Sequence, residues 1–243
     1  MRDGPSMAKI KPHLIESVVF LVIILLLSTG TYFRNEIWND EIGLWKDCLK
    51  KSPKKARPYV NLGYAYLIAG IYDQALKTTQ NALEIDPKFA NAYYNMSIIY
   101  QKMGDLNQAI KMGKEALEMD PGLHMAYYSL GGIYFEKGQY EESAEAYKRF
   151  LHDFSNFPNV HHLLGIAYAA QRQFDKAIKE FEYEIRINPY HTLAHLNLGQ
   201  IYWYEFHKRK EALDHLKAAL FLDPFLPNRG EIRRLVRALE GLP

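Results

Sequence analysis

Proline recurs along this chain at a nearly constant interval, and that interval limits the possible folds more than any other feature. The recurring prolines stand 34, 34, 68 and 35 residues apart, with Ser155 where one is missing: Pro53, Pro87, Pro121, Pro189 and Pro224. A fixed period of 34 residues is typical of repeats that each contain two packed helices. The sequence therefore predicts an all-α chain built from stacked helix pairs.

Numbering each copy from the position of Ala56 shows which residue types recur. Position 11 is tyrosine in all five copies: Tyr66, Tyr100, Tyr134, Tyr168 and Tyr202. Positions 8 and 20 carry small residues, which let two helices approach closely, while bulky residues at positions 4 and 11 fill the space beside them. Over residues 56–226 these five copies resemble the tetratricopeptide repeat family. The resemblance implies a helical solenoid with a concave groove that binds a protein or peptide.

Copies three and four depart from the shared pattern. Phe150 and Glu184 stand where copies one, two and five carry alanine, and Arg172 stands where copies one to three carry a glycine that ends the first helix. The repeat pattern therefore predicts the helix packing between these two copies less well than elsewhere.

The segment after the last repeat, residues 227–243, has the pattern of an amphipathic helix. Ile232, Leu235, Val236 and Leu239 follow the spacing i, i+3, i+4, i+7, and arginines occupy the positions between them. A terminal repeat needs such a helix because its apolar face would otherwise be exposed to water. We therefore predict a C-terminal capping helix.

An apolar run precedes the repeats. Residues 14–33 form a stretch of 20 residues, about 30 Å as a helix, and no charged residue follows Glu16 within it. The ten residues from Val18 to Leu27 favour insertion into a bilayer by about 3 to 6 kcal/mol. We expect one transmembrane helix over residues 14–33, after an N-terminal tail at residues 1–13. A cleaved signal peptide is the alternative, with Thr31 as the new N-terminus and a secreted repeat protein as the product.

The basic residues on either side of this run give a weak orientation signal. Three lie before it and two lie shortly after it: Arg2, Lys9, Lys11, Arg34 and Lys46. This balance favours an N-terminus inside the cell. We expect a single-pass membrane protein with its repeats on the extracytoplasmic side.

Residues 34–55 join the apolar run to the first complete repeat. Counting back one period places Trp45 and Cys48 on the second helix of an incomplete copy, which makes about five and a half repeats. Asp40 and Glu41 suit the first turn of that helix. We predict that Cys48 is buried and that Trp38 and Trp45 form a contact surface near the membrane. The stretch also resembles the junction in multi-pass, glycosyltransferase-like membrane proteins that carry such repeats.

Composition and motifs argue against several other functions. The 30 basic and 28 acidic residues nearly balance, so no strong field attracts nucleic acid. Glu36, Asp40 and Glu41 have no histidine, metal-ligand set or phosphate-binding loop near them in sequence, so we interpret them as helix-start residues rather than catalytic acids. His191 and His195 could share a helix face around a metal, but a structural role is the simpler interpretation. We predict no enzyme activity, no cofactor and no metal.

The family resemblance places positions 2, 5, 6, 9, 12 and 13 of each first helix on the concave groove. Amide and aromatic side chains gather at those positions and suit an extended peptide or a helix. The candidate binding residues are Asn61, Tyr64, Tyr94, Asn95, Tyr128, Phe135, His162, Asn197 and Trp203. A clamp for a carboxylate tail is not expected, because the matching positions lack its lysines and arginines.

These observations lead to one functional hypothesis and two alternatives. We expect a membrane-anchored scaffold that binds a protein or peptide partner, such as a subunit of a membrane or envelope complex. An accessory subunit of a membrane glycosyltransferase is one alternative, and the secreted repeat protein is the other. The sequence identifies neither the partner nor the oligomeric state.

Overall fold

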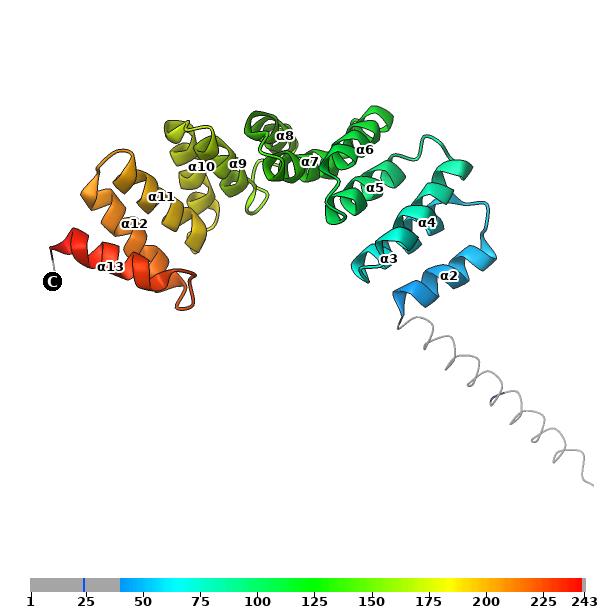
Figure 1. Ribbon diagram of the computed structural model, residues 1–243, viewed down its shortest axis with the longest axis horizontal. Helices are drawn as coiled ribbons and strands as arrows, with labels where there is room; N and C mark the ends of the chain where they lie inside the picture. The colour runs from blue at the N-terminus through cyan, green and yellow to red at the C-terminus, as the bar shows by residue number, and fades with distance from the viewer. Residues whose placement is uncertain (1–23, 25–39, 242–243) are drawn as a thin grey trace, which may run out of the picture. The chain divides into compact units, whose positions relative to one another are not determined.

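The computed structural model describes Ile24 and residues 40–241, and these residues form helices without any strand (Figure 1). The predicted membrane helix at residues 14–33, apart from Ile24, lies outside the described residues, as do the N-terminal tail and Trp38. No helix among the described residues has the length and apolar character needed to cross a bilayer. The described residues divide into two compact units, the first ending at Pro87 and the second beginning at Lys88.

The first unit contains α2 (Glu41–Lys51), α3 (Ala56–Ile68) and α4 (Tyr72–Ile85). Helix α2 begins as the sequence predicts, because the Asp40 carboxylate accepts hydrogen bonds from the amides of Ile42 and Gly43, at 3.1 and 3.0 Å. It packs against α3 in the place of a second repeat helix. No residue of α2 is fully buried. The prediction for Cys48 is therefore corrected, because this thiol is half-buried rather than buried.

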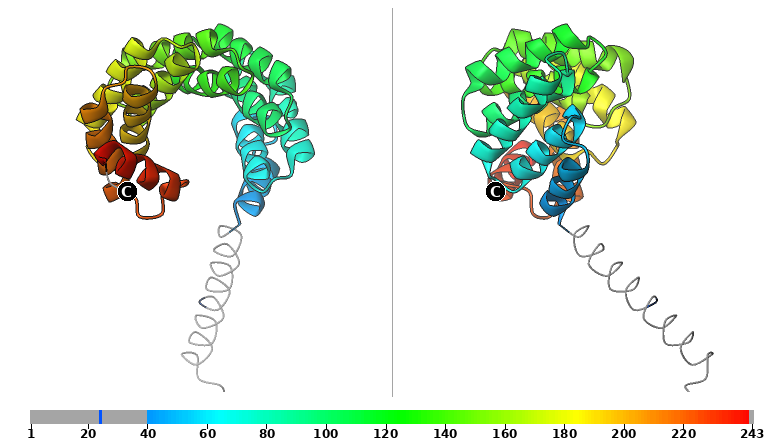
Figure 2. Two further views of the ribbon diagram at one scale, coloured as in Figure 1. Left: turned by 60° about the vertical axis from the view of Figure 1, so that its left-hand side comes forward. Right: turned by 90° about the vertical axis from the view of Figure 1, so that its right-hand side faces the viewer.

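The second unit consists of four helix pairs and a final helix, which follow one another along an arc (Figures 1 and 2). The elements in chain order are α5 (Ala90–Lys102), α6 (Leu106–Met119), α7 (His124–Glu136), α8 (Tyr140–Asp153), α9 (Val160–Ala170), α10 (Phe174–Ile187), α11 (Thr192–Tyr204), α12 (Arg209–Leu222) and α13 (Arg229–Glu240). The first helix of each pair is called the A helix below, and the second is called the B helix.

Small residues hold the two helices of a pair together, as the repeat pattern predicts. The Ser97 hydroxyl on α5 donates to the Ala109 carbonyl on α6, and the Ser143 hydroxyl on α8 donates to the Gly131 carbonyl on α7, both at 2.7 Å. At Gly165 on α9, an added β-carbon would lie 2.6 Å from the ring of Phe181 on α10. The backbones therefore approach too closely for a larger side chain at these positions.

Copies three and four differ from the others where the sequence indicates. Phe150 is buried, and its ring stacks against Phe154 and meets Phe157 edge-on. Both partners lie in the segment between α8 and α9, where the repeat proline is missing. Helix α9 starts at Val160, two residues later than the repeat register places it. Helix α13 buries Ile232, Val236 and Leu239 against α12, which confirms the predicted capping helix.

Candidate protein-binding surface

The predicted binding residues lie on the A helices of both units. In the first unit, α3 carries Asn61, which is half-buried, and Tyr64, which is 46% exposed. In the second unit the half-buried residues are Tyr94 on α5, Tyr128 and Phe135 on α7, and Asn197 and Trp203 on α11. Trp45 on α2 is half-buried and lines a shallow opening with Cys48.

Two of the predicted binding residues are almost fully covered. Asn95 on α5 is 7% exposed and His162 on α9 is 4% exposed. Their positions in the repeat are those expected for a groove, but neighbouring side chains cover them. These two residues therefore offer little surface to a partner.

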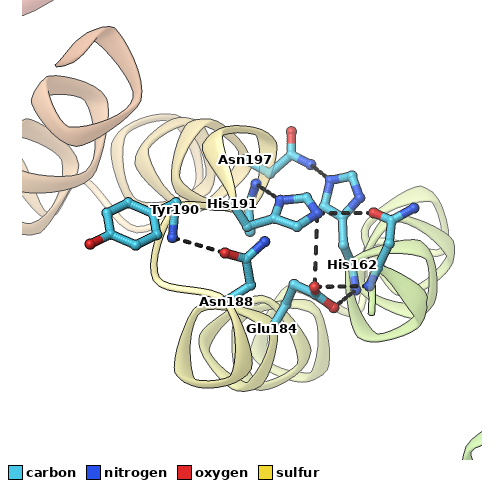
Figure 3. Close-up of polar contacts among 8 residues, drawn as sticks. His162, Glu184, Asn188, Tyr190, His191 and Asn197 are labelled. Atoms are coloured by element: carbon cyan, nitrogen blue, oxygen red, sulfur yellow. Dashed lines mark hydrogen bonds and ion pairs between the residues drawn. The ribbon is translucent and has the colours of Figure 1, made fainter. Parts of the chain in front are cut away.

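Polar side chains at positions 5 and 6 of successive A helices contact one another. The Asn197 amide on α11 donates to the His162 Nε2 atom on α9, at 3.1 Å (Figure 3). The Ser129 hydroxyl on α7 donates to the Tyr94 hydroxyl on α5, at 3.4 Å. Part of the hydrogen-bonding capacity expected for a ligand is thus already used within the protein.

His162 is held in its neutral form by its surroundings. Its Nε2 atom accepts the bond from Asn197, and its buried Nδ1 atom has no hydrogen-bond partner among the described residues. The ring packs against Phe181 and against His191, whose centroid lies 4.6 Å away. Burial, with a smaller effect from the charge of His191, lowers the pKa of His162 to about 4.

Glu184 explains why copy four departs from the repeat pattern. Its side chain is completely buried on α10 and accepts hydrogen bonds from the backbone amides of Asn159 and His162, at 2.9 and 3.3 Å. These amides belong to the first turn of α9, where backbone donors lack partners inside the helix. The carboxyl group of one helix thus caps the N-terminus of the preceding helix (Figure 3).

His191 completes this cap from the following turn. Its Nδ1 atom accepts a hydrogen bond from the Ala194 amide, so its Nε2 atom carries the proton and donates to the Asn159 side chain, at 2.9 Å. The same nitrogen lies 3.9 Å from the Glu184 carboxyl group. Asn159 itself has a φ of 70°, a left-handed conformation that asparagine tolerates. Residues from three successive segments therefore fix the start of α9.

Aromatic side chains dominate the A-helix face of copy three. The Tyr128 ring lies 5.5 Å from Phe150, 6.2 Å from Tyr147 and 6.3 Å from Phe157. Burial, reinforced by Tyr128, raises the pKa of the Tyr147 hydroxyl, so this hydroxyl stays protonated at neutral pH. Tyr128 and Phe135 both pack against a buried cluster that includes Tyr147 and Phe150.

Four exposed residues with large apolar side chains, on or beside the A helices of copies three to five, were not among the predicted binding residues. They are Met125, Phe157, Leu193 and Tyr204, with exposed fractions of 41, 40, 47 and 60%. Met125, Leu193 and Tyr204 occupy positions 2 and 13 of their copies, so the repeat register could have identified them. Phe157 lies in the irregular loop between α8 and α9, where the register gives no signal.

The histidines of the last two copies take part in packing and hydrogen bonding. The ring nitrogens of His191 and His195 have different partners: His191 bonds to Asn159 and the Ala194 amide, and His195 contacts His215 on α12, with 3.0 Å between their Nδ1 atoms. His161 fills its aromatic packing position against Tyr183, with a ring distance of 4.1 Å, and bonds to Glu180 at 2.6 Å. Within the described part of the chain, no three metal-binding side chains lie together.

Comparisons with known proteins agree with this architecture. Tetratricopeptide repeat family models match residues 54–122, 131–172 and 158–191. A search of curated protein sequences finds no match.

Several solved structures share the fold. The crystal structure of YrrB, described as a TPR protein with an unusual peptide-binding site, has a TM-score of 0.68 and 23% identity, covering 78% of this chain and 97% of YrrB. A crystal structure of MamA has a TM-score of 0.63 and 26% identity over 66% of this chain and 94% of MamA. MamA from Desulfovibrio magneticus RS-1 gives a TM-score of 0.64 and 22% identity, over 69% and 94% of the two chains. The chain therefore carries tetratricopeptide repeats over residues 54–122 and 131–191, and it has the fold of a protein-interaction scaffold.

Proposed function

We propose that this chain is an adaptor that binds a segment of a partner protein on the A-helix face of copies three to five. The observation that carries the proposal is an apolar strip on α7 and α11, defined by Met125, Tyr128, Phe135, Leu193, Trp203 and Tyr204. Met125, Leu193 and Tyr204 are exposed, and the other three are half-buried.

Exposing such an apolar strip to water is unfavourable, so its burial by a partner would be favourable. Large aromatic side chains that are already held by the core lose little freedom on binding, and they dominate the energetics of many interfaces. Tyr128, Phe135 and Trp203 are held in this way, because each packs against a buried cluster. YrrB and MamA support the proposal only through the fold that they share with this chain.

We further propose that residues 14–33 anchor the adaptor in a membrane, with the repeats on the extracytoplasmic side. The length and composition of this apolar run support the proposal. An anchored adaptor suits the assembly of a membrane or envelope complex. The alternative is that the chain is an accessory subunit of a membrane glycosyltransferase, and identification of the partner would distinguish the two.

The binding proposal can be tested by co-purification from native membranes in mild detergent. Leu193→Ala combined with Tyr204→Ala removes two exposed strip residues and leaves the buried clusters intact. The matched control is Tyr190→Ala combined with Phe225→Ala, because these side chains are 77 and 92% exposed and lie outside the strip. A partner retained by the wild type and the control but lost from the strip variant supports the proposal. Identical proteins recovered with all three chains would refute it.

The anchor is tested separately by alkaline carbonate extraction. The wild type is expected to stay in the membrane pellet, whereas Ile23→Arg with Leu26→Arg is expected to shift the chain to the supernatant, because each charge disfavours insertion by about 3 kcal/mol. Protease added to intact cells or vesicles then reports the side on which the repeats lie. A wild-type chain that is extracted, or that begins at Thr31, rules out the anchor.

A further inference from the structure

The charge of the apolar strip limits what it can bind. In copies three to five, Glu136 is the only acidic or basic residue at the A-helix positions 2, 5, 6, 9, 12 and 13. Its carboxylate accepts a hydrogen bond from the Gln101 side chain at 2.9 Å. His162 contributes no charge near neutral pH, since its pKa is lowered to about 4.

The polar groups beside the strip are partly occupied. Asn197 donates to His162, and Ser129 donates to Tyr94, so these side chains bond one another between neighbouring helices. On α9, positions 6 and 9 of the repeat carry Leu163 and Ile166, which are half-buried and apolar. A partner lying across α7, α9 and α11 would therefore meet mainly carbon atoms.

Helix α13 limits the strip at its C-terminal end. A cavity of about 130 Å³ lies between α11 and α13, where Leu196, Gln200 and Tyr204 face Asn228, Glu231 and Ile232. The capping helix thus borders the A-helix face next to Tyr204. A bound segment that follows the strip from α7 would end there against polar side chains.

Resting on the proposed function, we propose that the segment bound by the strip carries large aliphatic or aromatic side chains and is rejected when it contains carboxylates in the contact region. A carboxylate covered by this surface would lose its water without gaining a cationic partner at these A-helix positions, which costs several kcal/mol. An aliphatic or aromatic side chain would instead bury area on both sides of the interface. Specificity would then arise largely from the exclusion of carboxylates.

A random peptide library displayed on phage tests this inference with the full chain in detergent micelles. Clones are selected on the wild type and then depleted on the Leu193→Ala, Tyr204→Ala variant, so that only strip-dependent peptides remain. These peptides are expected to be rich in Leu, Ile, Phe, Tyr and Trp, with Asp and Glu at least about tenfold rarer than in the starting library.

In a second experiment, the same peptide selection is repeated with a variant that carries positive charges beside the strip. Leu193→Lys combined with Gln200→Lys places two cations on exposed positions of α11 and is expected to change the preference toward acidic peptides. Leu193→Met with Gln200→Asn is the matched control and should keep the wild-type preference. Both substitutions lie on the surface, and circular dichroism confirms that each variant remains helical.

The outcomes separate the inference from the proposed function. Strip-dependent peptides that are rich in Asp or Glu on the wild type would overturn the inference and leave the binding function standing. A preference that does not change with the lysine variant would also overturn it, because charge would then not be the selecting property. If no strip-dependent peptide is obtained at all, the binding function of the strip fails as well.

Discussion

At the scale of single residues, His162 occupies a position that usually faces a ligand, yet it serves as a buried hydrogen-bond acceptor. Its neighbours remove the ring from water, so the neutral form is favoured over the charged form. Protonation would break the bond from Asn197 and place a charge beside His191.

This environment predicts a specific dependence of stability on pH. The pKa of His162 falls from 6.5 in the unfolded chain to about 4 in the folded chain, so the unfolded chain binds more protons in that window. The neutral ring makes its full contribution to the free energy of unfolding above about pH 6.5. About 2 to 3 kcal/mol of that free energy is lost as the pH falls toward 4.

Urea unfolding at pH 7 and pH 4.5 measures this loss. His162→Gln removes the titrating ring and is expected to show a smaller difference between the two pH values than the wild type. His152→Gln is the control, because the His152 side chain is 77% exposed. An equal pH dependence in the wild type and the His162 variant would contradict the assignment. The variant comparison is needed because His161 titrates in the opposite sense: burial lowers its pKa, but hydrogen bonds to Glu180 and the Ser155 carbonyl raise it overall.

Arg172 provides a second prediction at the residue scale. It has a φ of 59° at the position where Gly70, Gly104 and Gly138 have values of 74, 83 and 81°. A side chain in this left-handed conformation costs about 1 kcal/mol that glycine avoids. The contact with Glu205 at 3.6 Å offsets little of this cost, since the Arg172 side chain is 79% exposed.

Arg172→Gly should therefore raise the free energy of unfolding by about 0.5 to 1 kcal/mol. Arg172→Ala loses the same side-chain contacts but keeps the β-carbon, so it should give no increase. Urea unfolding of the three chains under one condition decides the point, and equal effects from glycine and alanine would show that backbone strain is not the cause.

At the scale of helices, α9 depends on a cap that comes from α10 and the following turn. The irregular loop after α8 delays the start of α9 to Val160, and the amides of its first turn, which lack partners inside the helix, bond to the buried Glu184 carboxyl group. The sequence showed that copies three and four were unusual, since Phe150 and Glu184 interrupt the alanine pattern. It could not show how Glu184 is used, because its partners lie 22 and 25 residues away in the chain.

Removing this cap should destabilise the second unit. Glu184→Ala leaves the buried His162 amide and the partly buried Asn159 amide without this acceptor and is expected to cost about 2 to 4 kcal/mol, while Glu184→Gln keeps one acceptor and should cost less. Glu145→Ala on α8 is the control and should cost under about 0.5 kcal/mol, because its ion pair with Lys148 is exposed. Similar losses for Glu184→Ala and Glu145→Ala in urea unfolding would disprove the capping role.

At the scale of the molecule, stability in a repeat stack is expected to be largely local. Within the second unit each helix pair contacts mainly its neighbours, so damage at one end should weaken nearby pairs first. Helix α13 is a suitable place to test this, because its buried residues cover the last repeat.

Ile232→Asp buries a carboxylate against α12 and should cost about 3 kcal/mol or more within the last copies. Hydrogen exchange should then become faster in α11, α12 and α13 and remain unchanged in α5 and α6. Arg233→Asp places the same residue on the exposed side of α13 and serves as the control. Faster exchange throughout the second unit would show that the whole unit unfolds as one.

The sequence by itself determined the helix pairs, the sites of close helix approach and the capping helix, because each depends on residue types repeated at a fixed spacing. The tertiary structure decided which side chains of the A-helix face remain exposed. Asn197 and His162 are equivalent to ligand-facing positions by register, but they bond to each other, whereas Leu193 and Tyr204 project into water. The physical reason is that the exposure of a side chain depends on how closely the neighbouring A helix, about 35 residues away in the chain, packs against it. The residues of a single repeat do not determine that packing.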